Sequence, residues 1–176
     1  MRLEDAYYFK ILLLNGISDG YSEWLSTLLD QQDPLSDILL ELSFCISDIN
    51  KTISLLNNYC SGQPFDEKEV CDMLRKFLKN TYKENRFTKE EIISLMHRFV
   101  SAHAAPCDFD YATWGDMFYI DDYYSLAKDG TMSMEKFDRA FFEYLEHGTT
   151  IDSNSLWAFK TEQTLLQKIK KLFKRS

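Results

Sequence analysis

The sequence has few residues that break helices. Of its 176 residues only 6 are glycine and 3 are proline, whereas 45% are hydrophobic and 15% are aromatic. This composition supplies ample material for a core, and it argues against a disordered chain, a collagen-like repeat or a β-sandwich with many turns. The length suits one compact core, so we expect a single all-helical domain over residues 1–176.

Short catalytic motifs are also missing. The sequence has no G-x-S-x-G, no glycine-rich phosphate loop and no Glu-x-x-His pair, so nucleophilic, nucleotide and di-iron chemistry lack their required parts. The adjacent acids Asp121 and Asp122 leave acid–base catalysis open, although adjacent acids are usually only solvated. We therefore expect no enzyme activity and no cofactor.

The cysteines form no metal or redox motif. None of the four lies in a C-x-x-C pair or a Cys/His cluster, which argues against a zinc ribbon, a redox pair or haem attachment. We expect reduced thiols, since disulfides are rare in cytosolic proteins. The four are Cys45, Cys60, Cys71 and Cys107.

Long apolar runs are absent as well. The run Tyr7–Leu14 follows two acids and is broken by Lys10, unlike a signal peptide, so we interpret it as a core helix. No window approaches the roughly 18 uncharged apolar residues of a membrane span. These features predict a soluble, cytoplasmic protein.

The charge is negative and unevenly distributed. Twenty basic against 28 acidic residues give a net charge of −8, which disfavours binding to nucleic acid. Residues 107–152 carry eleven acidic and three basic side chains, whereas residues 160–176 carry six basic and one acidic. The basic end could bind an anionic membrane, or it could dock on the acidic part of the same chain or of a second copy. The negative charge of the whole chain disfavours the membrane and so favours docking on the acidic part.

Apolar residues recur at helical spacing along nearly the whole chain, which predicts an all-α fold. We expect about seven or eight helices stacked as antiparallel hairpins, as a helical repeat or an irregular bundle. The first helix should span Leu3–Leu14 and end at Asn15-Gly16, and the second should begin after Gly20.

Further starts are marked by capping residues. Pro34 is expected in the first turn of a third helix, which breaks near residues 43–47 so that Ser47 or Asp48 caps a fourth. Two later starts carry a capping box. Helices are also expected after Ser133, ending at Gly148, and from about Ser155. The capping boxes pair Asp66 with Glu69 and Thr88 with Glu91.

Two groups of residues suggest metals, and neither fits well. Asp129-Gly130 resembles the turn of a calcium loop, but the other ligand positions are not acidic. His97 and His103 lie near Cys107, Asp108 and Asp110, yet six residues separate the histidines, which does not match a zinc helix. We interpret both histidines as helix-end residues.

The most informative stretch is residues 110–124, the acidic aromatic segment. Its aromatic rings offer stiff contact surfaces and its acids complement a basic cleft. Alternatively, the aromatic rings belong to the core and the acids form the solvent-exposed side of the same helix. The candidate partner-binding residues are Asp110, Tyr111, Trp114, Asp116, Tyr119, Asp121, Asp122, Tyr123 and Tyr124.

Part of the chain resembles a known kind of protein. A Trp-containing helix with Ser22–Leu25, an acid-Pro step leading into Asp33–Ser43, and the stretch Ile49–Leu56 resemble small all-helical bacterial proteins catalogued as a domain of unknown function. Some of these are thought to be toxin-immunity proteins. The resemblance assigns no functional residue.

Together these features predict a monomeric or homodimeric protein that binds another protein. The specific hypothesis is an immunity-type inhibitor that covers the basic active site of a bacterial toxin. The alternatives are a helical scaffold or regulatory adaptor, and a metal-dependent hydrolase that uses His97, His103 and neighbouring acids.

Overall fold

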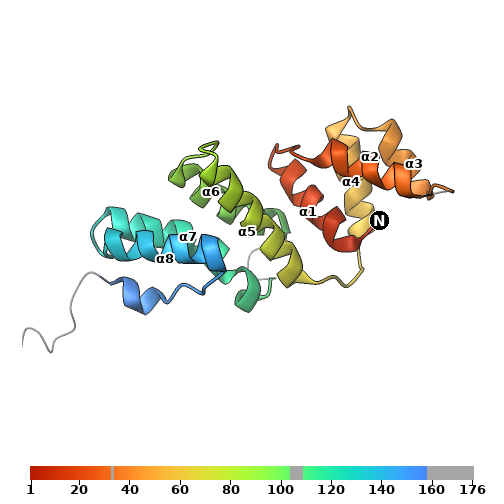
Figure 1. Cartoon of the computed structure of the whole chain (residues 1–176). Coiled ribbons are helices and arrows are strands. Elements are labelled where there is room, and N and C mark those ends of the chain that lie inside the picture. Colours follow the sequence, from red (N-terminus) through yellow and green to blue (C-terminus); the bar gives the residue numbers. More distant parts are fainter. Residues whose placement is uncertain (33, 104–108, 158–176) are drawn as a thin grey trace, which may run out of the picture. The chain divides into compact units, whose positions relative to one another are not determined.

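The computed structural model describes residues 1–32, 34–103 and 109–157. Across these ranges it contains eight α-helices, one 3-10 turn and no β-strand (Figure 1), which confirms the all-α prediction. None of the described helices is long and apolar enough to span a membrane. The elements are α1 (Leu3–Leu14), α2 (Tyr21–Gln31), α3 (Asp37–Phe44), α4 (Ile49–Cys60), α5 (Glu67–Lys83), α6 (Lys89–His103), α7 (Tyr111–Lys128), α8 (Met134–His147) and η1 (Ser153–Leu156).

The chain divides into two compact units. The first comprises Met1–Phe118 and the second Tyr119–Ser176, with the boundary inside α7. The expectation of a single domain stays a prediction. The acidic aromatic segment is split by this boundary, so its two parts belong to different units.

Helix α1 lies at the centre of the first unit. It contacts α4 as well as α5 and α6 (Figure 1). Six of its twelve residues are buried, including the consecutive run Phe9–Leu13. A helix that is apolar on all sides has to be covered on all sides, which explains why α1 occupies the middle. The hydroxyl of Tyr7 also donates to the Cys60 carbonyl of α4, at 3.0 Å.

The early helix boundaries follow the sequence signals, with one exception. Gly16 adopts a φ of +76° after α1, and the Asp48 carboxylate accepts from the Lys51 amide at 3.0 Å to cap α4. The expectation for Pro34 is wrong, because α3 begins only at Asp37. The carbonyl of Ser36, in extended conformation, accepts the first amides of that helix, and serine is favoured at such a position.

One of the two predicted capping boxes is complete. Thr88 and Glu91 form both hydrogen bonds of the box. The Thr88 amide donates to the Glu91 carboxylate at 2.8 Å, and the Glu91 amide donates to the Thr88 hydroxyl at 3.3 Å. The hydrogen bond that the Glu91 carboxylate accepts from the Thr88 amide is the main cause of the lowered pKa of Glu91.

The other box differs from the prediction. Asp66 does accept from the Glu69 amide at 2.9 Å, but Glu69 binds Arg2 instead of reaching back. The Asp66 amide donates to Glu4 of α1 at 3.3 Å. The first turn of α1 therefore supplies the carboxylate that the sequence pattern assigned to α5 itself.

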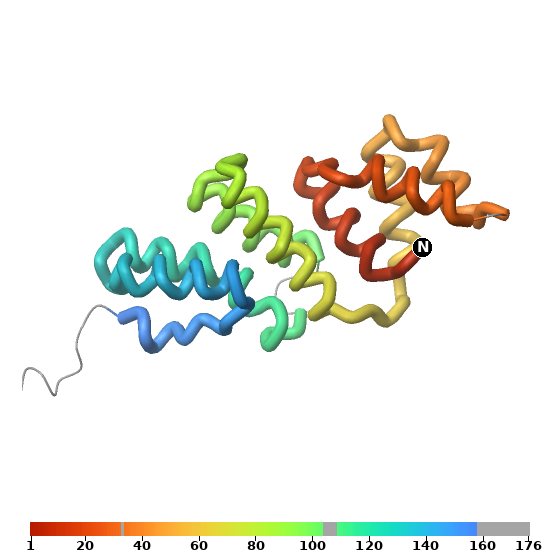
Figure 2. Tube along the Cα trace, in the orientation of Figure 1, coloured from red at the N-terminus to blue at the C-terminus, as the bar shows by residue number. Residues whose placement is uncertain are grey.

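In the second unit, the end of α7 and α8 form a hairpin (Figure 2). The turn between them contains Gly130, with a φ of +83°. The predicted inner side of α8 is confirmed as buried and comprises Phe137, Phe141, Tyr144 and Leu145.

The end of the described chain differs from the prediction. Ser153–Leu156 form a single 3-10 turn, and Trp157 makes an isolated antiparallel bridge with Met132, so the described residues 155–157 are not α-helical. The rest of the predicted basic helix lies outside the described residues.

Candidate protein-binding surfaces

The acidic aromatic segment begins with a helix cap. Asp110 accepts from the Ala112 amide at 3.1 Å and from the Thr113 hydroxyl at 2.8 Å, so its carboxylate organises the first turn of α7. Tyr111 is exposed, with its ring 4.8 Å from that of Phe109, and Asp116 is half-buried. In the first unit the segment thus presents Tyr111 to solvent and uses Asp110 structurally.

Trp114 is part of the core rather than of a surface. Its side chain is fully buried, its indole Nε1 donates to the Glu67 carboxylate at 2.7 Å, and its ring stacks on His103 at 4.6 Å. A side chain that already fills the interior cannot anchor a partner. The expectation that Trp114 forms part of the contact surface is therefore corrected.

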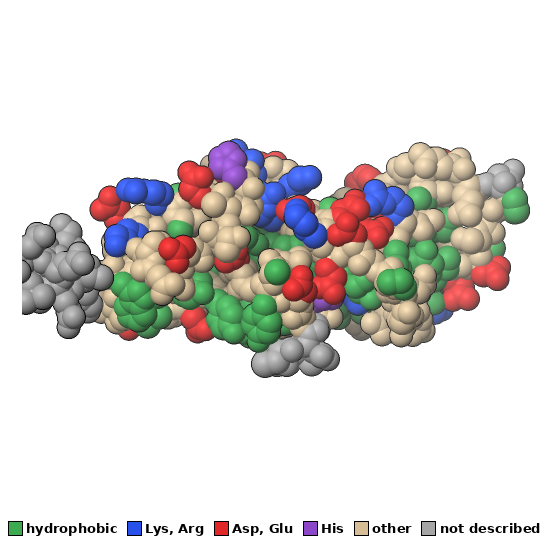
Figure 3. Space-filling model, turned by 90° about the horizontal axis from the view of Figure 1, so that it is seen from below, with side chains coloured by type: hydrophobic (Ala, Val, Ile, Leu, Met, Phe, Trp, Pro, Cys, Tyr) green, Lys and Arg blue, Asp and Glu red, His purple; other side chains and the backbone are tan. Residues whose placement is uncertain are grey.

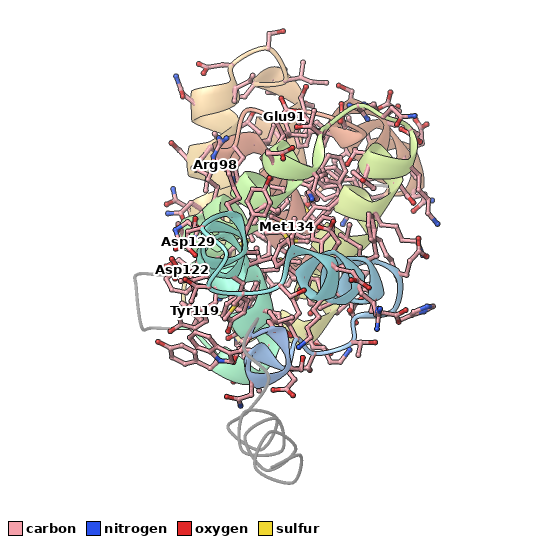
Figure 4. The ribbon with its side chains drawn as sticks, turned by 90° about the vertical axis from the view of Figure 1, so that its left-hand side faces the viewer. Glu91, Arg98, Tyr119, Asp122, Asp129 and Met134 are labelled. Carbon is pink, nitrogen blue, oxygen red and sulfur yellow. The ribbon has the colours of Figure 1, made fainter. Side chains whose placement is uncertain are left out.

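The part of the segment in the second unit remains accessible. Asp122 is exposed, and Tyr119, Asp121 and Tyr123 are half-buried. The rings of Tyr119 and Tyr123 lie 6.4 Å apart, one helical turn from each other. Figure 4 labels Tyr119 and Asp122 of α7 and Asp129, which follows α7, on the same side of the view. We call Tyr119, Asp121, Asp122 and Tyr123 the α7 acidic surface.

Tyr124 is half-buried and contacts α8. Its ring packs on Phe137 of α8 with a centroid separation of 5.4 Å, and the Lys128 ammonium lies 5.3 Å from the ring centroid. The interpretation of the rings as core therefore holds for Trp114, whereas Tyr119, Tyr123 and Tyr124 are half-buried. The role of the segment in binding a partner stays a prediction.

His103 belongs to a buried group in the first unit. Its side chain is 8% exposed, and Nε2 lies 3.5 Å from the same Glu67 carboxylate oxygen that binds Trp114. Its Nδ1 is buried and has no hydrogen-bond partner among the described residues. Burial lowers the pKa of His103, although the Glu67 charge opposes this shift. The imidazole is therefore held neutral as part of the packing.

His97 lies in a different environment. Its Nδ1 is 3.0 Å from the Phe118 carbonyl, and its ring stacks on that of Phe118. The structure therefore gives the two histidines different neighbours. Within residues 1–32, 34–103 and 109–157, no three His, Cys, Asp or Glu side chains converge as a metal site. Cys107 and Asp108 lie outside the described residues.

The described cysteines form no disulfide with one another, as predicted for reduced thiols. Cys45, Cys60 and Cys71 are all buried, and the Cys71 thiol donates to the Thr113 carbonyl at 3.4 Å. Burial raises the pKa of Cys60 to about 11. The thiolate is the reactive form, so Cys60 is unreactive near neutral pH.

A second accessible surface was missed by the sequence analysis. Leu40, Phe44, Ile46 and Ile49, at α3 and the start of α4, are exposed large hydrophobic residues, and Phe44 is 84% exposed. We call these four residues the α3–α4 patch. In the space-filling view, hydrophobic and acidic side chains lie close together over the part of the molecule that contains α2–α4 (Figure 3).

The signal for this patch was present in the sequence. Residues 11–50 contain no lysine or arginine, and residues 40, 44, 46 and 49 are apolar in addition to the buried Leu39 and Leu42. One face of a short helix cannot bury all of them. An apolar excess within an exclusively acidic stretch therefore marks this region.

A cleft of about 290 Å³ lies in the first unit between the end of α1 and α6. Its charged residues are Glu91 and Arg98, labelled in Figure 4. Glu91 caps α6 through Thr88, and Arg98 donates to the Asn15 carbonyl at 3.4 Å. Both charges serve the fold, so the cleft does not define a ligand site.

The described residues define an all-α protein with two accessible surfaces, the α7 acidic surface and the α3–α4 patch. Comparison with protein-family models finds no match, and none is found among curated proteins or solved structures. The resemblance to small bacterial helical proteins stays a prediction.

Proposed function

We propose that this protein is a non-catalytic, protein-binding protein, specifically an immunity-type inhibitor that covers the basic active site of a bacterial toxin. The α7 acidic surface is the observation that carries the proposal. There, an exposed Asp122 and a half-buried Asp121 lie on the same helix as two partly accessible tyrosines. The acids match a basic cleft, and tyrosine is enriched at protein interfaces.

The carboxylates of the α7 acidic surface affect the association rate, and its tyrosines affect the dissociation rate. Carboxylates of one sign steer a basic partner during diffusional encounter, which raises the association rate at low salt. Tyrosine rings that are already packed on their own helix lose little conformational freedom on binding. They add contact area and slow dissociation. The cytoplasm is the compartment that we infer for this interaction.

The first experiment identifies the partner. The purified full chain serves as bait in lysates of its source cells from exponential and stationary phase, at low and at high salt. Mass spectrometry identifies the retained proteins. The proposal predicts a basic protein that elutes as the salt concentration rises. If both lysates yield only proteins whose retention is independent of salt, the proposed electrostatic mechanism is wrong.

A helical scaffold or adaptor is the second candidate function. The α3–α4 patch favours it, because exposed apolar side chains on a folded surface often mark a protein interface. An adaptor needs two surfaces occupied at once. Simultaneous binding of two proteins by the same bait, shown by co-elution in gel filtration, distinguishes this function from an inhibitor with one partner.

A further inference from the structure

The exposed face of α3 presents apolar and acidic side chains together. Leu40 and Glu41 follow Asp37 by three and four residues, and Phe44 follows it by seven. Positions with this spacing share one face of a helix, so the four side chains project from α3 together. All four are exposed, whereas the opposite face supplies the residues that α3 buries. A molecule that covers Leu40 and Phe44 therefore also meets two carboxylates.

The turn that joins α3 to α4 is held in a defined conformation. The Thr52 hydroxyl donates to the Cys45 carbonyl at 3.0 Å, and the Asp48 amide donates to the same carbonyl at 2.7 Å. The Asp48 carboxylate in turn caps α4. Ile46 and Ile49, which lie in and directly after this turn, are therefore fixed relative to α3. A fixed apolar surface costs less entropy to cover than a flexible one.

The surroundings of the patch add negative charge. Helix α3 contacts α2 and α4. Residues 21–60, which comprise these three helices and their connections, contain six acids and one basic residue, Lys51 in the first turn of α4. The patch is thus an apolar surface in a negative environment, and its complement is apolar and positively charged.

This charge argues against two other occupants. Pairing of the patch with the same patch of a second copy would bring Asp37 and Glu41 close to their own counterparts, which is unfavourable. An anionic membrane surface would be repelled by the same carboxylates, because anionic lipids attract basic segments rather than acidic ones. A cationic partner remains as the occupant that both the charge and the apolar side chains favour.

The backbone favours a helical partner over an extended one. The described residues contain no β-strand, so an extended peptide would find no strand edge in them with which to pair its backbone. A helix satisfies its own backbone hydrogen bonds and binds through its side chains alone. Contact with the exposed face of α3 and the turn after it needs side chains only, which suits a helix.

We propose that the α3–α4 patch binds an amphipathic helix of another protein, in which lysines or arginines flank the apolar face. The apolar face of that helix covers the four apolar side chains of the patch, and its basic residues pair with Asp37 and Glu41. The patch lies wholly within the first unit. The interaction is therefore separate from the proposed binding of a toxin by the α7 acidic surface.

A synthetic helix tests the proposal on the full chain. The probe is a fluorescein-labelled peptide of about 18 residues, or five turns, made of leucine and lysine with the leucines on one face. A peptide of the same composition, permuted so that the leucines share no face, is the control. Fluorescence anisotropy measures both affinities. We expect the natural chain to bind the amphipathic peptide about tenfold more tightly than the permuted one.

Variants of the chain assign the binding to the patch. F44S and D37K/E41K should each weaken binding of the amphipathic peptide about tenfold, the second chiefly at low salt. F142S is the matched control, because Phe142 is an aromatic residue on α8 and is 41% exposed. Circular dichroism verifies that each variant is folded. Equal affinity of F44S and the natural chain, or equal weakening by F44S and F142S, overturns the proposal.

The α7 acidic surface provides a further control. D121K/D122K should change the affinity for the amphipathic peptide by less than about twofold, because the patch is a different surface. If D121K/D122K abolishes peptide binding and D37K/E41K leaves it unchanged, the peptide binds at α7 and the proposal for the patch is wrong. Failure of one surface to bind is in this way distinguished from failure of the other.

Hydrogen exchange locates the peptide on the natural chain without any substitution. The amides of residues 37–50 should exchange more slowly when the amphipathic peptide is added, whereas those of α8 should be unaffected. Unchanged exchange of residues 37–50 at a saturating concentration of the peptide contradicts the proposal.

Two further outcomes would assign the patch to another occupant. Sedimentation of the natural chain as a dimer and of F44S as a monomer would show that a second copy covers the patch. Binding of the natural chain, but not of F44S, to vesicles that contain phosphatidylglycerol would show that a membrane does. Either result overturns the proposal, which predicts that both chains sediment alike and that neither binds these vesicles.

Discussion

The indole Nε1 of Trp114 donates to the carboxylate of Glu67 at 2.7 Å, and this bond joins α7 to the start of α5. His103 of α6 stacks on the same indole and approaches the same carboxylate oxygen. Residues from α5, α6 and α7 in the first unit thus meet at one half-buried acceptor. The bond explains why the largest aromatic side chain of the acidic aromatic segment belongs to the core.

The first prediction concerns Glu67. In E67A the buried indole N–H of Trp114 loses its acceptor, so the free energy of unfolding should fall by about 1–3 kcal/mol. E67Q keeps a carbonyl oxygen and should lose less. Urea denaturation followed by tryptophan fluorescence and circular dichroism measures both. E90A, at an exposed residue on α6, is the control, and equal effects of E67A and E90A would contradict the assigned bond.

The second prediction is a pH dependence. The pKa of His103 is lower in the folded chain than the usual value of 6.5 because of burial, so the unfolded chain binds the proton more tightly. Its contribution to stability is therefore complete above pH 6.5 and is lost as the pH falls through the lower folded pKa.

The difference in unfolding free energy between the natural chain and H103Q should accordingly shrink as the pH is lowered from 8 to about 5. His147, which is exposed at the end of α8, provides the matched control H147Q. A pH-independent difference for H103Q would show that His103 does not titrate as its burial requires.

The third prediction concerns the cap of α6. T88A removes the hydroxyl that accepts from the Glu91 amide, and it should destabilise the chain by about 1 kcal/mol. Thr27 lies inside α2, where alanine is a better helix former, so T27A should leave stability unchanged or slightly raise it. Thermal or urea unfolding compares the two, and an equal loss in both would argue against the cap.

The fourth prediction tests whether the α3–α4 patch belongs to the surface or to the core. Phe44 is 84% exposed, so F44S should change the unfolding free energy by no more than about 0.5 kcal/mol. Phe99 is fully buried, and F99A should cost about 3–5 kcal/mol. Urea unfolding compares both with the natural chain. A large destabilisation by F44S would mean that the patch is part of the core.

Much of the fold was predictable because its signals are local. Gly16 and Gly148 stop helices, and Thr88 with Glu91 begins one, through atoms only a few residues apart. The acid that completes the start of α5 was not predictable in this way. It is Glu4, 62 residues away in the sequence, which becomes a neighbour only through the packing of α1 on α5.

The candidate surface was predictable only in part, for a similar reason. Tyr119 and Trp114 have the same kind of side chain in the same helix, and only the neighbouring helices decide which is covered. The acceptor of Trp114 is Glu67 on another helix, and no spacing within α7 shows it. The α3–α4 patch has a weaker signal, because residues 11–50 are distinguished only by having no basic residue and not by an acid-rich run such as residues 107–152.

The central claim is that the α7 acidic surface captures a basic partner. The most direct test measures the association rate of the captured partner by stopped flow at low and high salt, with the natural chain and the double variant D121K/D122K. The variant E135K/E143K on α8 changes the net charge equally at exposed residues of the same unit and is the control. We expect D121K/D122K to slow association about tenfold or more at low salt and E135K/E143K to have a much smaller effect. Equal association rates for D121K/D122K and the natural chain would contradict it.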